Sequence, residues 1–341
     1  MKRKGSILIL SLLVFLVVFM VVVYVLHLST IHMHIAKNKS TNNQGFYTSE
    51  AKIYMCMYED KYFKSQLQPL ILNEFRKTMN KPKDYILLST EDIEEGDSEK
   101  KVSLSFEMQN NRKCLKLFSK TENNNQTINA SSLFTVVKEL FEKGLPVLHK
   151  DYLNEQQQEE VLDYIGILER DISLNNIASH INKIDFLDYE SIIVNTIYKN
   201  DMELLYRKNS QVVKVDPFIH WDKNKVKEFF ILMEDKFNKE PELYIQSDNP
   251  TSMDGVLYLN GDLIINSEFI FNGIIIINNG RIIVNSEINP IINGIIISNG
   301  EEGWIDLDRV TVNYDRKYIY RYGTYLPDFL DYEFLVLKKR E

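Results

Sequence analysis

The sequence predicts an N-terminal transmembrane helix, an α+β middle domain and a C-terminal β-rich repeat region, which we expect to form a short β-solenoid. Three observations lead to this prediction. Residues 6–28 form an almost uninterrupted apolar run, residues 50–247 mix helical and strand-like patterns, and residues 248–315 repeat a short phrase. A middle region of this length is sufficient for a hydrophobic core of its own.

The first element is the apolar run of residues 6–28, which contains no Asp, Glu, Lys or Arg. About 20 helical residues, each rising about 1.5 Å, span the roughly 30 Å hydrocarbon core of a bilayer. The run is longer than the apolar part of a cleaved signal peptide, and no small-x-small cleavage site follows it. We therefore expect an uncleaved anchor that contacts membrane lipid.

The distribution of basic residues predicts the orientation of this anchor. Lys2, Arg3 and Lys4 precede it directly, whereas Lys37 and Lys39 follow it at a distance. Positive residues favour the cytoplasmic side. Residues 1–5 are thus a basic cytoplasmic leader, and we expect a single-pass cell-membrane protein whose C-terminal domain is extracytoplasmic. Residues 29–49 are polar and patternless around 37–46, which indicates a linker.

The middle region, residues 50–247, carries both kinds of pattern. Apolar spacing predicts a helix over 131–144, closed by Gly144, and Asn154 with Gln157 resembles the capping box of a second helix. Asp222 is placed to cap a third helix that runs to Phe237. Strands are expected between these helices, at 102–108, 114–118, 191–198 and 211–215.

Residues 248–315 repeat two phrases. One starts with Asn-Gly and the other with Gly and a β-branched run; their starts are Asn260, Asn279 and Asn299, and Gly255, Gly273 and Gly294. Such spacing favours a β-solenoid with Ile264, Ile275, Ile283 or their neighbours inside. An antiparallel meander is the alternative, because Asn-Gly also marks hairpins. The apolar run 274–277 favours the solenoid, because it needs cover on both faces. The middle domain could cover one end, and the aromatic and charged tail, residues 316–341, the other.

Composition limits the function. The net charge is −8, and the part of the chain without the basic leader is more acidic still. This charge disfavours nucleic acid as a partner. The six histidines are scattered, and no metal-ligand spacing, nucleophile motif or phosphate-binding loop is present. We therefore expect a protein that is not an enzyme and has no metal or cofactor. The abundance of Ile, Asn and Lys is typical of an AT-rich bacterial genome.

Two groups of carboxylates are candidate sites. Glu268 and Glu287 occupy equivalent places in successive repeats, where rungs about 4.8 Å apart would suit paired acid–base work or Ca²⁺ binding. The simpler interpretation is that both lie at solvated corners, with the neighbouring Asn266 and Asn285 amides forming a ladder. The acidic run 91–99 lacks the alternation of a calcium loop and predicts an exposed loop.

The two cysteines, Cys56 and Cys114, allow two interpretations. In an oxidising compartment they could form a disulfide, which for a loop of this size would contribute about 4 kcal/mol. They are equally compatible with two free, buried thiols. The sequence leaves both alternatives open, because it does not show how closely the two residues approach.

The two ends of the chain carry a family resemblance. The basic leader, Gly5 and the hydrophobic helix that begins at Ser6 resemble the N-terminus of type IV pilin-like proteins. The resemblance implies that a prepilin peptidase cuts between Gly5 and Ser6. The C-terminal repeats resemble those of large minor pilins and pilus-assembly proteins of bacteria. Leu10 stands where major pilins carry glutamate, which favours a minor subunit or speaks against the family.

These observations together predict a membrane-anchored structural or interaction protein of the bacterial cell envelope. The resemblance implies a minor pilin-like component of a type IV pilus or a related secretion filament, with other pilin-like subunits as partners. The alternative is an anchored β-solenoid protein that binds or cleaves cell-surface glycans.

Overall fold

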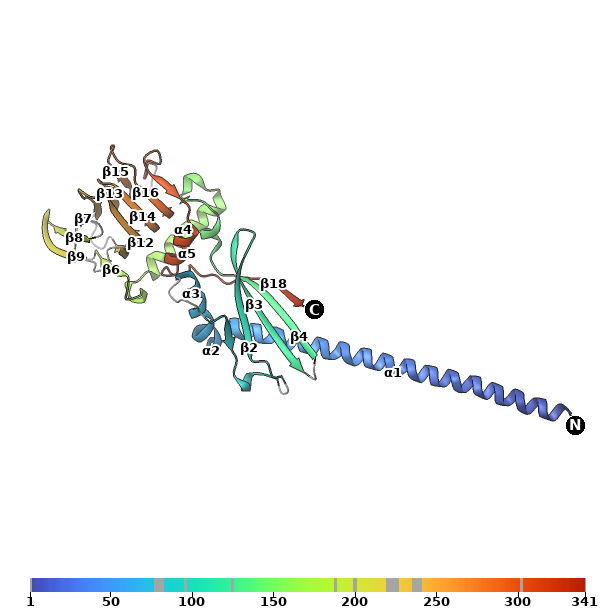
Figure 1. The fold of residues 1–341 in the computed structure, drawn as a ribbon. Helices are drawn as coiled ribbons and strands as arrows, with labels where there is room; N and C mark the ends of the chain where they lie inside the picture. The colour runs from blue at the N-terminus through green and yellow to red at the C-terminus, as the bar shows by residue number, and fades with distance from the viewer. Residues whose placement is uncertain are drawn as a thin grey trace.

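The computed structural model describes residues 2–76, 83–94, 97–123, 126–186, 189–198, 201–218, 227–234, 241–300 and 303–340. Within these ranges, one long helix leads from the N-terminus into a mostly β body with three sheets (Figure 1). The helices are α1 (Lys2–Tyr58), α2 (Asp60–Tyr62), α3 (Gln68–Arg76), α4 (Glu155–Asp171) and α5 (Arg316–Gly323). Short π- or 3₁₀-helical turns are η1 (Phe63–Leu67), η2 (Thr90–Asp92), η3 (Glu139–Glu142), η4 (Lys150–Tyr152) and η5 (Leu174–Asn176).

Helix α1 contains the predicted membrane segment and is, within the described ranges, the one helix long and apolar enough to cross a bilayer. The predicted linker at 29–49 is wrong, because α1 continues through it to Tyr58. No proline interrupts this stretch, and extending a helix that has already formed costs little. Side chains from residue 8 to residue 40 are exposed, whereas Gly45 and Ser49 are buried against the body. A Cβ at Gly45 would lie 2.3 Å from Ile128 Cδ1, so the helix and the sheet are in close contact.

The last part of α1 packs on an antiparallel sheet of five strands. In spatial order these are β1 (Tyr85–Leu87), β2 (Lys101–Gln109), β3 (Arg112–Asn123), β4 (Gln126–Thr135) and β18 (Phe334–Arg340). Strands β2 and β3 confirm two sequence predictions. The C-terminal tail does not cap the repeats: β18 completes this sheet beside β4, and α5 contacts β12, β14 and β16.

The helix predicted over 131–144 is wrong. Residues 131–135 lie in β4, and only the turn η3 follows. Residues 130–137 are all buried, so their apolar pattern reflects a segment covered on both faces rather than a helical period. Gly144 has a φ of +78° and ends the segment in a left-handed conformation.

The other two sheets are mainly parallel. The seven-stranded sheet has the order β17 (Thr311–Asn313), β16 (Ile291–Ser298), β14 (Phe269–Ile277), β12 (Thr251–Leu259), β10 (Lys227–Met233) and β6 (Asn182–Asp185), with β5 (Val147–Leu148) beside β16. The six-stranded sheet has the order β15 (Ile282–Val284), β13 (Asp262–Ile265), β11 (Glu242–Ile245), β7 (Ser191–Tyr198), β8 (Asp201–Lys208) and β9 (Gln211–Phe218). Strands β7 and β9 were predicted. The antiparallel meander is wrong for residues 248–315, because β12, β14 and β16 pair in parallel, as do β13 and β15.

Two further predictions in the middle region need correction. The helix expected to run to Phe237 is wrong over 227–233, where β10 lies between β6 and β12. Its expected cap, Asp222, lies outside the described residues. The boundary near residue 248 does not separate two structural units either, because the parallel sheets already include β6 and β7. The capping box of Asn154 and Gln157 is confirmed at the start of α4.

The seven-stranded sheet is a central layer, buried on both faces. Ile274 and Ile276 belong to a core shared with α1, α3, α4 and α5, whereas Ile275 and Ile277 belong to a core shared with the six-stranded sheet. All four side chains are fully buried, which explains the continuous apolar run. Ile275 points inward as predicted; in β13 and β15 the buried residues are the immediate neighbours of Ile264 and Ile283, namely Leu263, Ile265 and Ile282.

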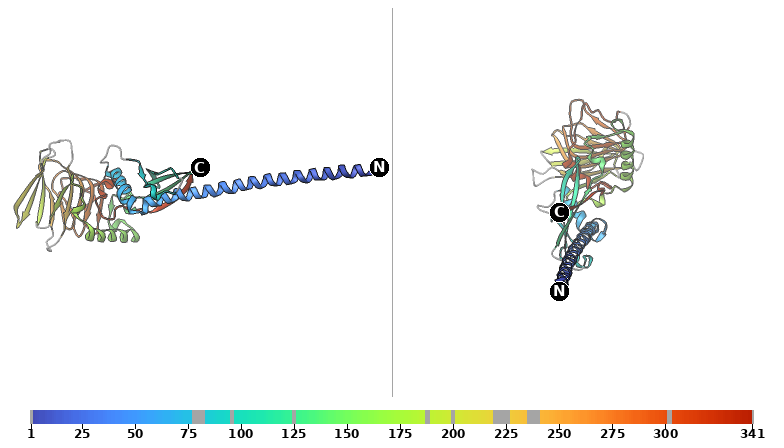
Figure 2. Two further views of the ribbon diagram at one scale, coloured as in Figure 1. Left: turned by 90° about the horizontal axis from the view of Figure 1, so that it is seen from below. Right: turned by 90° about the vertical axis from the view of Figure 1, so that its right-hand side faces the viewer.

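The repeated glycines allow the strands of the seven-stranded sheet to stack at a kink. Gly255, Gly273 and Gly294 are direct neighbours in register and have φ values of +139°, +156° and +147°. A Cβ at Gly273 would lie 1.9 Å from the carbonyl oxygen of Gly255. The six-stranded sheet forms the end of the molecule opposite the N-terminus (Figure 2).

Candidate functional site

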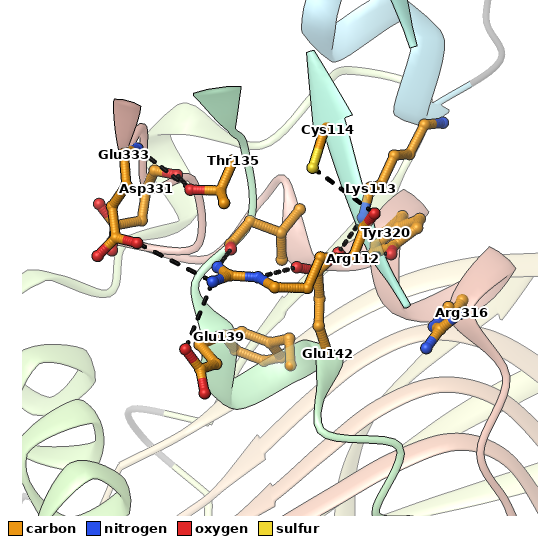
Figure 3. Close-up of polar contacts among 12 residues, drawn as sticks. Arg112, Lys113, Cys114, Thr135, Glu139, Glu142, Arg316, Tyr320, Asp331 and Glu333 are labelled. Carbon is orange, nitrogen blue, oxygen red and sulfur yellow. Dashed lines mark hydrogen bonds and ion pairs between the residues drawn. The ribbon is translucent and has the colours of Figure 1, made fainter. Parts of the chain in front are cut away.

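A buried ionic cluster joins the five-stranded sheet to the parallel sheets. Its centre is the carboxylate of Glu142, at the end of η3, whose side chain has no exposed surface. Arg112 Nε, at the start of β3, donates to Glu142 at 2.9 Å, and the backbone amide of Lys113 donates at 2.8 Å. The hydroxyl of Tyr320, from α5, donates at 2.7 Å (Figure 3). Three segments distant in sequence therefore meet at one carboxylate.

Arg112 extends this cluster to the C-terminal part of the chain. Its guanidinium donates to the carbonyl of Val137 at 3.0 Å and lies 3.4 Å from Glu139 and 3.9 Å from Glu333. Burial, and then the hydrogen bond to Glu142, raise the pKa of Tyr320 well above its usual value. Tyr320 thus keeps its proton and donates to Glu142, and the cluster fixes three segments of the chain to one another.

A cavity of about 480 Å³ lies beside this cluster. The ammonium group of Lys113 lies 4.8 Å from the ring centre of Phe75, 5.1 Å from that of Phe106 and 5.8 Å from that of Tyr320. It also forms an ion pair with Glu74 at 2.8 Å. The aromatic rings of this cavity thus already form cation–π contacts with a lysine of the chain itself. Chemically, the arrangement stabilises the joint between the sheets.

The structure places the predicted processing residues, Gly5 and Ser6, within the first turns of α1. Cys56 lies on α1 and Cys114 on β3, and both are buried free thiols. Burial, and next the carboxylate of Glu59, raise the pKa of Cys56 to about 12. Burial is also the main cause that raises the pKa of Cys114.

The candidate carboxylate pair, Glu268 and Glu287, is exposed and lies in the turns after β13 and β15. The prediction of an exposed loop over 91–99, of which residues 95 and 96 lie outside the described residues, is only partly correct. Asp97 is buried and forms an ion pair with Lys52, and Asp92 accepts hydrogen bonds from Lys61 and Tyr62. These carboxylates hold the loop against α1 and α2, so they are not free for a ligand.

Sequence reasoning missed the polar ladder of the seven-stranded sheet. Asn272 donates to Asp254 at 2.6 Å, Asn293 donates to Asn272 at 2.9 Å, and Asn313 donates to Asn293 at 3.0 Å. Burial raises the pKa of Asp254, whose carboxylate lies 3.4 Å from the hydroxyl of Tyr322. The sequence carries a signal of this ladder, because Asp254, Asn272 and Asn293 each directly precede a repeated glycine. Asn266 and Asn285, where a ladder is expected, are both exposed and lie outside this sheet.

Within the described ranges, no group of three or more His, Cys, Asp or Glu side chains is arranged to hold a metal ion. Comparisons of the chain with family models, with curated proteins and with solved structures found no match.

Proposed function

We propose that this chain is a single-pass membrane protein that acts as a minor pilin-like component of a type IV pilus or a related secretion filament. The observation that best supports this proposal is the continuity of α1, which runs from the apolar segment into the body without a break. Its last turns are fixed to the five-stranded sheet by Gly45, Ser49 and Lys52. One continuous helix therefore joins the anchor to the body, which suits a filament subunit.

The exposed part of α1 beyond the membrane segment also favours lateral assembly. From residue 29 to residue 44 the helix extends roughly 24 Å at about 1.5 Å per residue. Ile31, Met33 and Ile35 expose 40%, 63% and 59% of their surface there. A lone helix in water is marginal, and exposed apolar side chains favour a partner. Neighbouring pilin-like helices would cover this surface.

The body supports a structural role. In our proposal the strands that alternate between the two parallel sheets are coils of a β-solenoid, with the shared core of Leu257, Leu263 and Ile275 as its interior. The ionic cluster around Glu142 fixes this solenoid to the five-stranded sheet. The body lies outside the cytoplasmic membrane, because the basic leader keeps the N-terminus inside.

Two measurements on native cells test this proposal. Protease added to spheroplasts should digest the body while the membrane segment stays protected, and filaments sheared from the cells should contain the chain in small amounts. A body that becomes accessible only after lysis would contradict the orientation. A chain that stays entirely in the membrane of filament-producing cells would contradict the assembly role.

A further inference from the structure

An apolar row crosses the whole outer face of the six-stranded sheet. Direct neighbours in register contribute one side chain from each strand, in the order Ile283, Ile264, Tyr244, Ile193, Leu205 and Val215. They face away from the interior, because the alternate residues, such as Leu243 and Leu263, belong to the core. We call these six side chains the outer row.

The outer row is not part of either hydrophobic core of the described residues. Ile193, at its centre, is buried, but Ile283 and Val215, at its two ends, are 42% and 47% exposed. The centre of the row is thus already covered within the monomer, and its exposed apolar surface lies mainly toward the two ends. Exposed apolar surface of this kind favours association.

A second row beside it carries several charged side chains. Across the same strands, from β15 to β9, this row contains Arg281, Asp262, Glu242, Ser191, Arg207 and Val212. Acidic groups lie near the middle, and an arginine stands on either side. The Nε of Arg207 is buried and has no hydrogen-bond partner among the described residues, so a partner would be met by the outer nitrogens of this guanidinium.

We propose that the outer face of the six-stranded sheet pairs with the same face of a second copy of this chain. A twofold axis parallel to the strands superimposes the first strand of one copy on the last strand of the other. Ile264 then meets Leu205 of the second copy, and Tyr244 meets Ile193 of the second copy. In the charged row, Asp262, which lies 3.8 Å from Arg281 of its own chain, also meets Arg207 of the second copy, and this contact forms twice.

The size and chemistry of the face agree with such pairing. Six strands about 4.8 Å apart and about six residues long give a face of roughly 600 Å² per copy. The pair would bury about 1,200 Å², which is the lower end of the range for specific interfaces. Aliphatic side chains dominate the row, and Tyr244 is its one aromatic residue. A protein surface therefore fits better than a glycan, which aromatic platforms would favour.

Pairing through this face has a geometric consequence. The six-stranded sheet lies at the end of the molecule farthest from the N-terminus (Figures 1 and 2). Two copies that meet there direct their α1 helices in opposite directions. The contact therefore joins chains from two apposed membranes or filament tips. Pairing itself depends only on the sheet face, whereas its role between membranes rests on the proposed function.

A charge-exchange experiment with the full chain in detergent tests the pairing. We expect sedimentation to show dimers of the native chain. In Asp262→Arg and in Arg207→Asp, each self-pairing would place like charges opposite each other twice, so self-association should weaken at least about tenfold. An equimolar mixture of the two variants makes both contacts complementary again and should recover native affinity. Because α1 is identical in every sample, association through the helix does not contribute to these differences.

A matched apolar pair provides the control. Ile283→Asp, on the outer row, should weaken the dimer, whereas Ile270→Asp, equally exposed at 41% on the other sheet, should not. A mixture that associates no better than either variant alone would overturn the proposal. A monomeric chain whose outer face binds soluble glycans would overturn it as well. Neither result depends on whether the chain enters filaments. Failure of the pairing can therefore be told apart from failure of the proposed function.

Discussion

Lys52 of α1 forms an ion pair with Asp97, with 2.5 Å between Nζ and Oδ2, and the two side chains are only 2% and 1% exposed. The same ammonium group donates to the carbonyl oxygens of Glu99 at 2.6 Å and Lys120 at 2.9 Å. A single buried cation thus connects the long helix to the loop before β2 and to β3. This polar link between the anchor helix and the body is almost completely buried.

We predict that Lys52→Met lowers the free energy of unfolding by about 3–5 kcal/mol, because it leaves the Asp97 carboxylate buried without its partner. Chemical unfolding of the detergent-solubilised chain measures this loss. The matched control is Lys61→Met, since the Lys61 ammonium group is 55% exposed and its ion pair with Asp92 should contribute much less to stability. Equal losses for the two variants would contradict the role of Lys52.

The cysteines give a second prediction. Without reductant, both Cys56 and Cys114 should resist alkylation at pH 8 in the folded chain and react fully after denaturation. The pKa of Cys56 is raised from 9.0 to about 12, so the folded state holds a proton that the unfolded state loses. The resulting stability is present below pH 9 and is lost as the pH rises toward 12. Thiols that become reactive only after reduction would indicate a disulfide instead.

A charged side chain in the core between the parallel sheets should be poorly tolerated. Ile275→Asp would place an unpaired carboxylate where the native side chain is fully buried, and should cost more than about 3 kcal/mol. Ile270→Asp, on the same strand but 41% exposed, should change stability by less than about 0.5 kcal/mol. Thermal unfolding of both variants makes the comparison. Similar melting temperatures would disprove the packing described for β14.

Two glycines should respond in opposite directions to the same substitution. Gly273→Ala should destabilise the chain, because the new methyl group would lie 1.9 Å from the Gly255 carbonyl oxygen. Gly166, in the middle of α4, has nothing within 4 Å of an added Cβ. Gly166→Ala should therefore stabilise the chain by up to about 1 kcal/mol through helix propensity. Unfolding curves that shift in the same direction for the two variants would contradict the close stacking of Gly273 on Gly255.

Local sequence patterns predicted several elements correctly. The capping box at Asn154 and Gln157 places two reciprocal hydrogen bonds within four residues, so the pattern itself specifies the start of α4. The repeated glycines indicated regular strands, because stacking in parallel requires the same residue at the same place in each repeat. Strand β7 was also visible, from its β-branched residues.

Distant contacts could not be predicted in this way. Strand β18 pairs with β4 some 200 residues earlier, and the spacing of Phe334 and Val336 does not reveal which strand they join. In β4 and β10, cover on both faces produced apolar runs that fitted a helical period equally well. The polar segment 29–49 is helical because a neighbouring helix extends into it and the sheet covers its end. The sequence around Cys56 and Cys114 did not indicate whether these thiols are free and buried or joined in a disulfide.

The central claim, that this chain is a pilin-like subunit, is tested most directly at its N-terminus. Intact-protein mass spectrometry of the native membrane form, from cells with an active prepilin peptidase, measures where the chain begins. The proposal predicts removal of the basic leader, so that the mature chain starts at Ser6. A chain that still begins at Met1 would contradict the pilin-like assignment.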